Sequence, residues 1–176
     1  MRRSRVHVLG ASGSGTTTLA RALADRWSVP HADADDYFWR PTTPPFTHKR
    51  EVAERVALMR QLFVPREAWV LSGSMLGWGD EIVAQCQAVV FLTLDPGERM
   101  RRLERREDLR AEDRPADPEA RARFLDWARS YDDPGFTGRS RSHHEAWLRR
   151  LEVPVLRLDS AHPVPALLDS VLRWEP

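Results

Sequence analysis

Apolar residues along the chain fall into two patterns, and these patterns alternate. Short apolar runs, such as residues 6–9 and 88–94, are rich in β-branched side chains, which is typical of buried strands. Other segments space their apolar residues as Leu19, Leu23 and Trp27 are spaced, which predicts amphipathic helices. The predicted strands are residues 6–9, 29–33, 68–74, 88–94 and 153–159. The predicted helices are residues 16–27, 49–64, 78–86, 96–110, 118–133, 142–151 and 164–174.

The order of these elements predicts the fold class. Strands that alternate with helices favour a parallel sheet whose two faces are covered by helices, an α/β fold in three layers. The run at residues 88–94 is almost wholly apolar, as expected of a strand in the middle of such a sheet. With 176 residues, the chain has the length of one domain, and we expect a single domain over residues 1–176.

Composition and charge argue against several classes of function. The formal net charge is +1, which gives no overall attraction to nucleic acid or to a membrane surface, so neither is an expected partner. No stretch approaches the ~20 apolar residues of a membrane helix, and we expect no signal peptide. Cys86 is the only cysteine, which fits a reducing compartment, and we expect a cytoplasmic protein. The sequence leaves the oligomeric state open.

A glycine-rich segment, GASGSGTT, separates the first predicted strand from the first predicted helix. It matches the phosphate-binding pattern G-x-x-x-x-G-K-[ST] except that Thr16 replaces the lysine. Glycines let backbone N–H groups converge on an anion, and the helix start adds its dipole. Thr17 is the predicted Mg²⁺ ligand. The predicted nucleotide-binding residues of this loop are Gly10, Ala11, Ser12, Gly13, Ser14, Gly15, Thr16 and Thr17.

Two other interpretations of this loop remain open. The first is a glycine turn that binds no ligand. The second is a loop that binds nucleotide without supporting catalysis, because Thr16 carries no charge and is too short to reach the β- and γ-phosphates as a lysine does.

Three features together resemble the P-loop nucleoside monophosphate kinase-like family, which includes adenylate kinase, shikimate kinase and gluconate kinase. They are the glycine loop on the first strand, the acidic stretch after the second strand and the arginine-rich helix after the fourth. The loop with Thr16 looks like a bacterial subgroup of these kinases. Membership would imply a five-stranded parallel sheet in the order 2-3-1-4-5, a helical lid at roughly residues 107–141, ATP and Mg²⁺ as cofactors, and a small-molecule acceptor.

The acidic stretch begins at the end of the second predicted strand. If the chain stays extended there, Asp33 and Asp35 point to the same side, toward the crevice where such sheets bind ligands. Shikimate kinase has a similar D-x-D, so the resemblance implies that Asp33 or Asp35 orients an acceptor hydroxyl or holds Mg²⁺ through water. The alternative is a solvated acidic turn. The third strand departs from the family, because Ser72 and Gly73 stand where an acidic residue usually precedes the glycine.

The helix predicted at residues 96–110 is rich in arginine. Arg102 and Arg106 lie four residues apart on one face, and arginines here stack on adenine and clamp phosphates in the resembling kinases. Both are predicted catalytic residues, Arg102 also binding nucleotide, and a solvated helix face is the alternative. Arg139 and Arg141 are weaker candidates for the same phosphates. By fold analogy alone, His162 lies where related kinases hold the adenine.

Lys49 is the only lysine of the chain and stands at the head of the helix predicted at residues 49–64. The proline-rich loop before it leaves the end of the second strand and is able to fold over the phosphates. Because Thr16 cannot supply the charge that phosphoryl transfer requires, we predict that Lys49, or failing it Arg50, supplies this charge as a catalytic residue. The alternatives are a solvated lysine and a site whose lid arginines carry the charge alone.

These features favour an ATP-dependent phosphotransferase that acts on a nucleoside monophosphate or on a hydroxyl-bearing metabolite. Two other functions fit the same residues. One is a nucleotide-binding regulatory protein with a kinase-like but inactive site, and the other is a slow NTP hydrolase without an acceptor.

Overall fold

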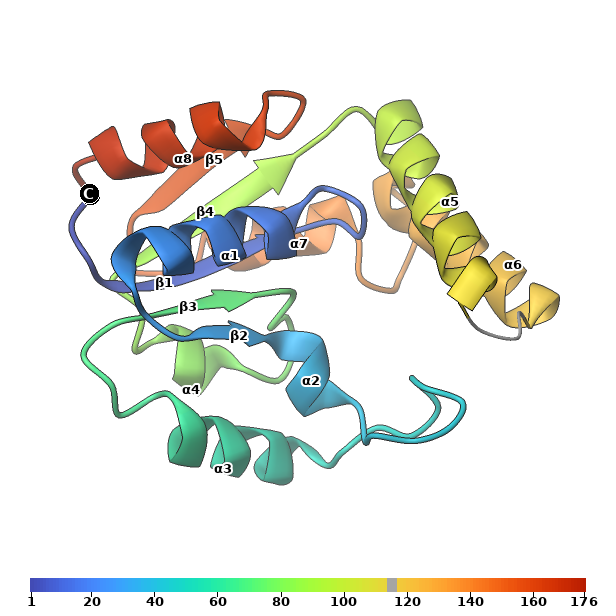
Figure 1. Ribbon diagram of the computed structural model, residues 1–176, viewed down its shortest axis with the longest axis horizontal. Helices are drawn as coiled ribbons and strands as arrows, with labels where there is room; N and C mark the ends of the chain where they lie inside the picture. The colour runs from blue at the N-terminus through green and yellow to red at the C-terminus, as the bar shows by residue number, and fades with distance from the viewer. Residues whose placement is uncertain (114–116) are drawn as a thin grey trace.

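A parallel five-stranded sheet forms the centre of the computed structural model, which describes residues 1–113 and 117–176 (Figure 1). The strands are β1 (Arg5–Gly10), β2 (His31–Asp33), β3 (Trp69–Ser72), β4 (Ala88–Thr93) and β5 (Val155–Asp159). Their order across the sheet is β2-β3-β1-β4-β5, and all neighbours are parallel. The predicted fold class and strand order are both confirmed.

Helices cover both faces of this sheet. On one face, Val6 and Val8 of β1 share a core with helices α1 and α8, and on the other face Leu9 shares a core with α3, α4 and α7. Because both faces are buried, β1 and β4 have nearly continuous apolar sequences. The helices are α1 (Thr16–Trp27), α2 (Ala34–Phe38), α3 (Val52–Leu62), α4 (Asp80–Val83), α5 (Pro96–Asp113), α6 (Pro118–Arg129), α7 (Arg141–Leu148) and α8 (Val164–Arg173).

The register of the sheet decides which residues meet at its carboxyl edge. Val8 of β1 lies opposite Ser72 of β3, and Ser72 lies opposite Asp33 of β2. Gly10, which ends β1, lies opposite Leu92 of β4. The start of the glycine loop and the last residues of β2 and β3 therefore come together at one edge, although they are far apart in the sequence.

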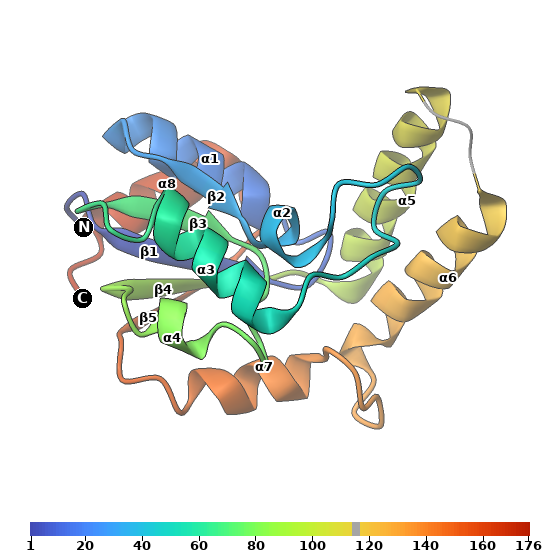
Figure 2. The same ribbon diagram turned by 90° about the horizontal axis from the view of Figure 1, so that it is seen from below.

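Helices α5 and α6 form a pair that projects beyond this carboxyl edge (Figures 1 and 2). The pair has a small apolar core of its own, made of Met100 and Leu103 from α5 with Leu125 and Ala128 from α6. A short 3-10 helix, η1 (Ser130–Asp132), follows α6. The polar break that the sequence predicts between the two helices lies partly outside the described residues. The loop between α2 and α3 projects on the same side of the sheet as this helix pair (Figure 2).

The chain does not stay extended over residues 33–35, which was the condition for Asp33 and Asp35 to point to the same side. Asp33 ends β2, and the five residues after it form α2. The carboxylate of Asp33 causes this turn, because its Oδ1 accepts a hydrogen bond from the Asp35 backbone N–H at 3.1 Å and so caps the helix. The alternation of an extended strand therefore does not decide where the side chains of Asp33 and Asp35 point.

The predicted helix start at Lys49 is also wrong, because α3 begins at Val52. Lys49 instead pairs with Trp39 in an isolated antiparallel bridge. The backbone N–H of Arg50 donates to the carbonyl of Phe38 at 2.9 Å, and the N–H of Arg40 donates to the carbonyl of His48. These bonds between the two sides of the loop replace the backbone hydrogen bonds of a helix.

Candidate active site

The glycine loop forms a tight turn between β1 and α1. Gly13 and Gly15 have φ angles of 88° and 85°, in the left-handed region that favours glycine, and Gly15 is the N-cap of α1. Ser14 is fully buried, and both its Oγ and its backbone N–H donate to the carbonyl of Ala11, at 2.8 and 3.1 Å. The loop therefore has the folded-back shape that turns successive N–H groups toward one anion.

Gly10 and Gly13 are closely packed, whereas Gly15 lies beside open space. A Cβ on Gly10 would lie 2.6 Å from the carbonyl oxygen of Leu92, and a Cβ on Gly13 would lie 2.7 Å from Leu103. A Cβ on Gly15 would meet no atom within 4 Å. Gly15 thus faces open space at the N-terminus of α1, where a phosphate group would be bound.

Three elements converge on the carboxylate of Asp33. Its Oδ2 accepts hydrogen bonds from the Thr17 hydroxyl at 2.9 Å and from the Ser72 hydroxyl at 3.0 Å. His31 Nε2 lies 3.0 Å from the Ser72 hydroxyl, which completes a chain of polar contacts from α1 through β2 to β3. The Thr17 hydroxyl therefore lies in contact with the Asp33 carboxylate at the carboxyl edge of the sheet.

This position suits Mg²⁺. The oxygens of Thr17, Asp33 and Ser72 are the hard ligands that Mg²⁺ prefers, and Mg²⁺ keeps several waters and needs only one or two carboxylates. Within residues 1–113 and 117–176, no group of three or more histidine, cysteine, aspartate or glutamate side chains is placed to hold a metal ion. The oxygens of Thr17, Asp33 and Ser72 fit a Mg²⁺ ion that is shared with a phosphate ligand.

Asp35, in the first turn of α2, lies in the field of two arginines. Desolvation, together with the charge of Asp33, raises the pKa of the Asp35 carboxyl, while Arg139 and Arg106 act in the opposite direction. Desolvation also lowers the pKa of the Arg139 guanidinium. These charged groups therefore lie close enough to interact, and they come from α2, from α5 and from the loop after η1, whose Arg139 contacts Ser12 of the glycine loop.

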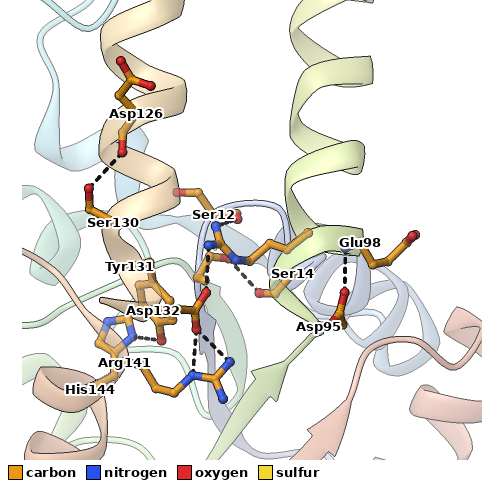
Figure 3. A network of polar contacts seen from close by, with 12 residues as sticks. Ser12, Ser14, Asp95, Glu98, Asp126, Ser130, Tyr131, Asp132, Arg141 and His144 are labelled. Atoms are coloured by element: carbon orange, nitrogen blue, oxygen red, sulfur yellow. Dashed lines mark hydrogen bonds and ion pairs between the residues drawn. The ribbon is translucent and has the colours of Figure 1, made fainter. Parts of the chain in front are cut away.

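An ion-pair network supports the glycine loop from beneath α5 and α6 (Figure 3). Arg99 is almost fully buried and donates to the carboxylate of Asp132 at 2.9 Å and to the carbonyl of Ser12 at 3.3 Å. Arg141 donates to the other oxygen of Asp132 at 2.9 Å. Because the single carboxylate of Asp132 pairs with both cations, the network links the glycine loop to α5, η1 and α7.

Two buried histidines extend this support toward β3. His144 lies between the Tyr131 hydroxyl, 2.9 Å from its Nδ1, and the Ser74 hydroxyl, 2.8 Å from its Nε2. His7 donates from Nε2 to the carbonyl of Gly73 at 2.7 Å. Burial lowers the pKa of His144 to about 3 and that of His7 to about 4, so both rings are neutral at physiological pH.

The remaining predicted residues lie at the margins of this region. Arg102 donates to Glu98 Oε1 at 3.0 Å and to the carbonyl of Ser160 at 3.1 Å, which links α5 to the turn after β5. His162 lies exposed in that turn. The Lys49 ammonium lies 5.7 Å from the ring centroid of Phe38.

Arg50, the second choice after Lys49, has its donors occupied by the chain itself. Its guanidinium donates to the backbone carbonyls of Asp36 and Tyr37 at 2.9 and 3.1 Å. It therefore holds α2 and the following loop together in this structure.

Sequence reasoning gave little weight to one residue near the glycine loop and missed two others. Arg139 donates to the Ser12 hydroxyl at 2.9 Å, whereas the sequence made it only a weak candidate. The sequence did not predict Asp132 or His7 as residues that support the site. Asp132 belongs to the acidic pair Asp132–Asp133, but its partners Arg99 and Arg141 belong to other helices.

The sheet order, the glycine loop and the contact between Thr17 and Asp33 together define a P-loop kinase fold. Residues 6–123 match the protein-family model described as an AAA domain. This match spans more than half of the chain, and the chain therefore belongs to this AAA domain family. The uncharacterized protein YqaC of Bacillus subtilis (strain 168) is 38% identical over 176 residues, which covers 98% of this chain and 97% of YqaC.

Two solved structures share this fold at low sequence identity. Shikimate kinase from Acinetobacter baumannii, in complex with shikimate, matches with a TM-score of 0.60 and 19% identity over 97% of this chain and 92% of that one. A gluconokinase from Sinorhizobium meliloti 1021 matches with a TM-score of 0.52 and 17% identity over 98% of this chain and 91% of that one. In the part of the chain that the structure describes, no helix is long and apolar enough to cross a bilayer.

Proposed function

We propose that this protein is an ATP-dependent phosphotransferase that transfers the γ-phosphoryl group to the hydroxyl of a small molecule or to a nucleoside monophosphate. The observation that carries the proposal is the contact between the Thr17 hydroxyl and Asp33 Oδ2, at 2.9 Å. It joins a loop suited to phosphates with a carboxylate suited to the metal side of the reaction. A glycine turn without a ligand has no need of this arrangement.

Different groups of the chain would bind the phosphates and the metal ion. Backbone N–H groups between Gly10 and Thr17, apart from that of Ser14, which donates to the carbonyl of Ala11, would hold the phosphates of ATP. Thr17 and Asp33 would hold Mg²⁺ directly or through water. When bound, Mg²⁺ supplies positive charge that neutralises the β- and γ-phosphates. Ser72 orients the Asp33 carboxylate through the hydrogen bond at 3.0 Å.

Asp35 is the proposed partner of the acceptor. The acceptor oxygen bonds to the γ-phosphorus as the bond to the bridging oxygen breaks, ADP leaves, and Asp35 orients the acceptor hydroxyl and takes up its proton. Desolvation and the charge of Asp33 raise the pKa of the Asp35 carboxyl, which makes it a stronger base than an ordinary aspartate. Arg106, which is coupled to Asp35, and Arg102 stabilise charge on the transferred group.

The acceptor side is proposed to lie beside α2. A depression of about 200 Å³ is lined by Asp35, Asp36, Trp39, Arg40, Pro41, Thr42, Pro45, Phe46 and Arg50. Asp35 is thus shared between this depression and the region of the arginines above the glycine loop. A small polar acceptor with a hydroxyl group would fit such a mixed aromatic and charged surface.

One observation favours a second candidate function, a nucleotide-binding regulatory protein with an inactive site. Thr16 stands where these loops carry the lysine that contacts the β- and γ-phosphates. An NTP hydrolase without an acceptor is the third candidate. The three functions differ in what happens to ATP, so one set of measurements separates them.

The test is a screen of nucleoside monophosphates and hydroxyl-bearing metabolites for ATP-dependent phosphorylation, with ADP formation followed at the same time. A kinase forms ADP only with its acceptor, a hydrolase forms ADP without one, and a regulatory protein binds ATP and forms none. Thr17→Val should abolish the Mg²⁺-dependent step. Thr18→Val is the matched control, because Thr18 is exposed and adjacent, and it should behave as the wild type.

A further inference from the structure

Thr16 leaves the glycine loop without the cation that phosphoryl transfer requires. Negative charge on the transferred group must be met by a preorganised donor, and the backbone N–H groups carry no formal charge. The replacement must therefore come from another element. A suitable side chain would be anchored beside the loop and would have donors that no protein carboxylate occupies.

Arg139 lies in such a position. It belongs to the loop between η1 and α7, and its Nη2 donates to the hydroxyl of Ser12, inside the glycine loop, at 2.9 Å. The guanidinium carbon lies 4.6 Å from the ring centroid of Trp127 on α6, which fixes the plane of the group. Arg139 is also coupled electrostatically to Asp35, the proposed partner of the acceptor. The cation thus lies between the phosphate loop and the acceptor side.

The three arginines near this loop differ in how their charge is balanced. Arg99 and Arg141 both form ion pairs with Asp132, at 2.9 and 2.8 Å. Among the described residues, no carboxylate lies within 4.0 Å of Arg139. Its Nε, like that of Arg99, is buried without a hydrogen-bond partner. Arg139 is half-buried, and a partly desolvated cation without a counter-charge is costly, so an anion bound beside it would offset that cost.

We propose that Arg139 takes the place of the missing lysine and binds the β- and γ-phosphates of a nucleoside triphosphate held by the glycine loop. This inference rests on the proposed function and names the residue that supplies its charge. A guanidinium suits the role because it offers several donors to one phosphate while Ser12 and Trp127 hold it in place. The prediction for Lys49 is the competing assignment, and the two are tested together.

The experiment measures the binding of the non-hydrolysable analogue AMP-PNP with Mg²⁺ by calorimetry. Arg139→Met should weaken binding about tenfold or more, the loss expected for one charge-assisted contact. Adding Thr16→Lys to Arg139→Met should restore most of the affinity, because it returns the lysine to its usual position. A purely structural role for Arg139 would give no such rescue. If Arg139→Met fails to fold, Arg139→Gln serves, because its amide removes the charge and keeps the capacity to donate a hydrogen bond.

Arg123→Ala is the control for these variants. It removes an exposed arginine of α6 that pairs with Glu119, and it should bind as the wild type does. Lys49→Ala tests the competing assignment, and the inference for Arg139 expects this variant to bind within about twofold of the wild type.

Three results would overturn the inference while leaving the proposed function intact. They are unchanged binding by Arg139→Met, weakened binding without rescue by Thr16→Lys, and a loss in Lys49→Ala as large as that in Arg139→Met. Failure of the wild type to bind AMP-PNP would instead remove the proposed function itself.

Discussion

Lowering the pH from about 7 to about 5 should weaken the fold through two buried histidines, His7 and His144. Each is fully enclosed, and each is bonded in its neutral form to groups at the end of β3, the carbonyl of Gly73 and the hydroxyl of Ser74. The pKa of His7 is lowered to about 4 and that of His144 to about 3, from an ordinary value of 6.5. In both cases desolvation by burial is the largest cause.

The sign of the effect follows from which state takes up protons first. The folded pKa of each histidine lies below the unfolded pKa, so the unfolded chain binds protons first as the pH falls. The stability is complete above pH 6.5 and is lost between pH 6.5 and the folded values. The slope is about 1.4 kcal/mol per pH unit for each group, which gives about 2 kcal/mol for each histidine by about pH 5. Against a total stability of about 5–15 kcal/mol, the combined loss is large.

Urea denaturation followed by circular dichroism at several pH values between about 5 and 7 measures this loss. The double variant His7→Gln, His144→Gln should start less stable than the wild type but lose much less stability across this range. His48→Gln, which changes an exposed histidine of the α2–α3 loop, should keep the wild-type pH dependence. If the double variant and the wild type lose the same stability between these pH values, the assignment of buried neutral histidines is wrong.

Three further predictions concern the site itself. Gly15→Val should abolish ATP binding measured by calorimetry, because a side chain at φ 85° costs about 1–2 kcal/mol and enters the open space above α1, and equal affinity in the variant would exclude the loop as the site. Asp33→Asn should reduce the Mg²⁺ dependence of nucleotide binding in titrations with and without the metal, whereas an unaltered dependence would place the metal elsewhere. Replacing Arg102 or Arg106 with Ala should lower turnover by orders of magnitude in a coupled ADP assay with the melting temperature within a few degrees of wild type, and unchanged turnover would indicate a surface role.

Local patterns in the sequence were sufficient for the elements of the sheet and for the glycine loop. The period of an apolar strand or helix is set by backbone geometry within a few residues, so α1 was predicted with its observed bounds, Thr16–Trp27. The glycine loop is contiguous, and its spacing is readable without any contact from elsewhere. The order of the strands came from resemblance to a family, since periodicity alone does not decide which strands pair.

Short elements and loop pairings were beyond such patterns. Helix α2 has five residues, which is too short for a period to emerge, and its start depends on one hydrogen bond from Asp33. The bridge between Trp39 and Lys49 joins the two arms of a loop, and nothing in the local sequence distinguishes it from the start of a helix.

The chemistry of the candidate site was decided by the tertiary structure. Thr17, Asp33 and Ser72 come from three elements, and only the register of the sheet brings their oxygens to one position. The sequence alone does not distinguish Arg139 from Arg141. In the structure, Asp132 forms an ion pair with Arg141 and not with Arg139. Ion pairing depends on distances in space of about 4 Å or less, which the chain sets only when it folds. The sequence alone shows that Thr16 stands where the lysine is expected, and only the folded structure places Arg139 beside the loop as its candidate replacement.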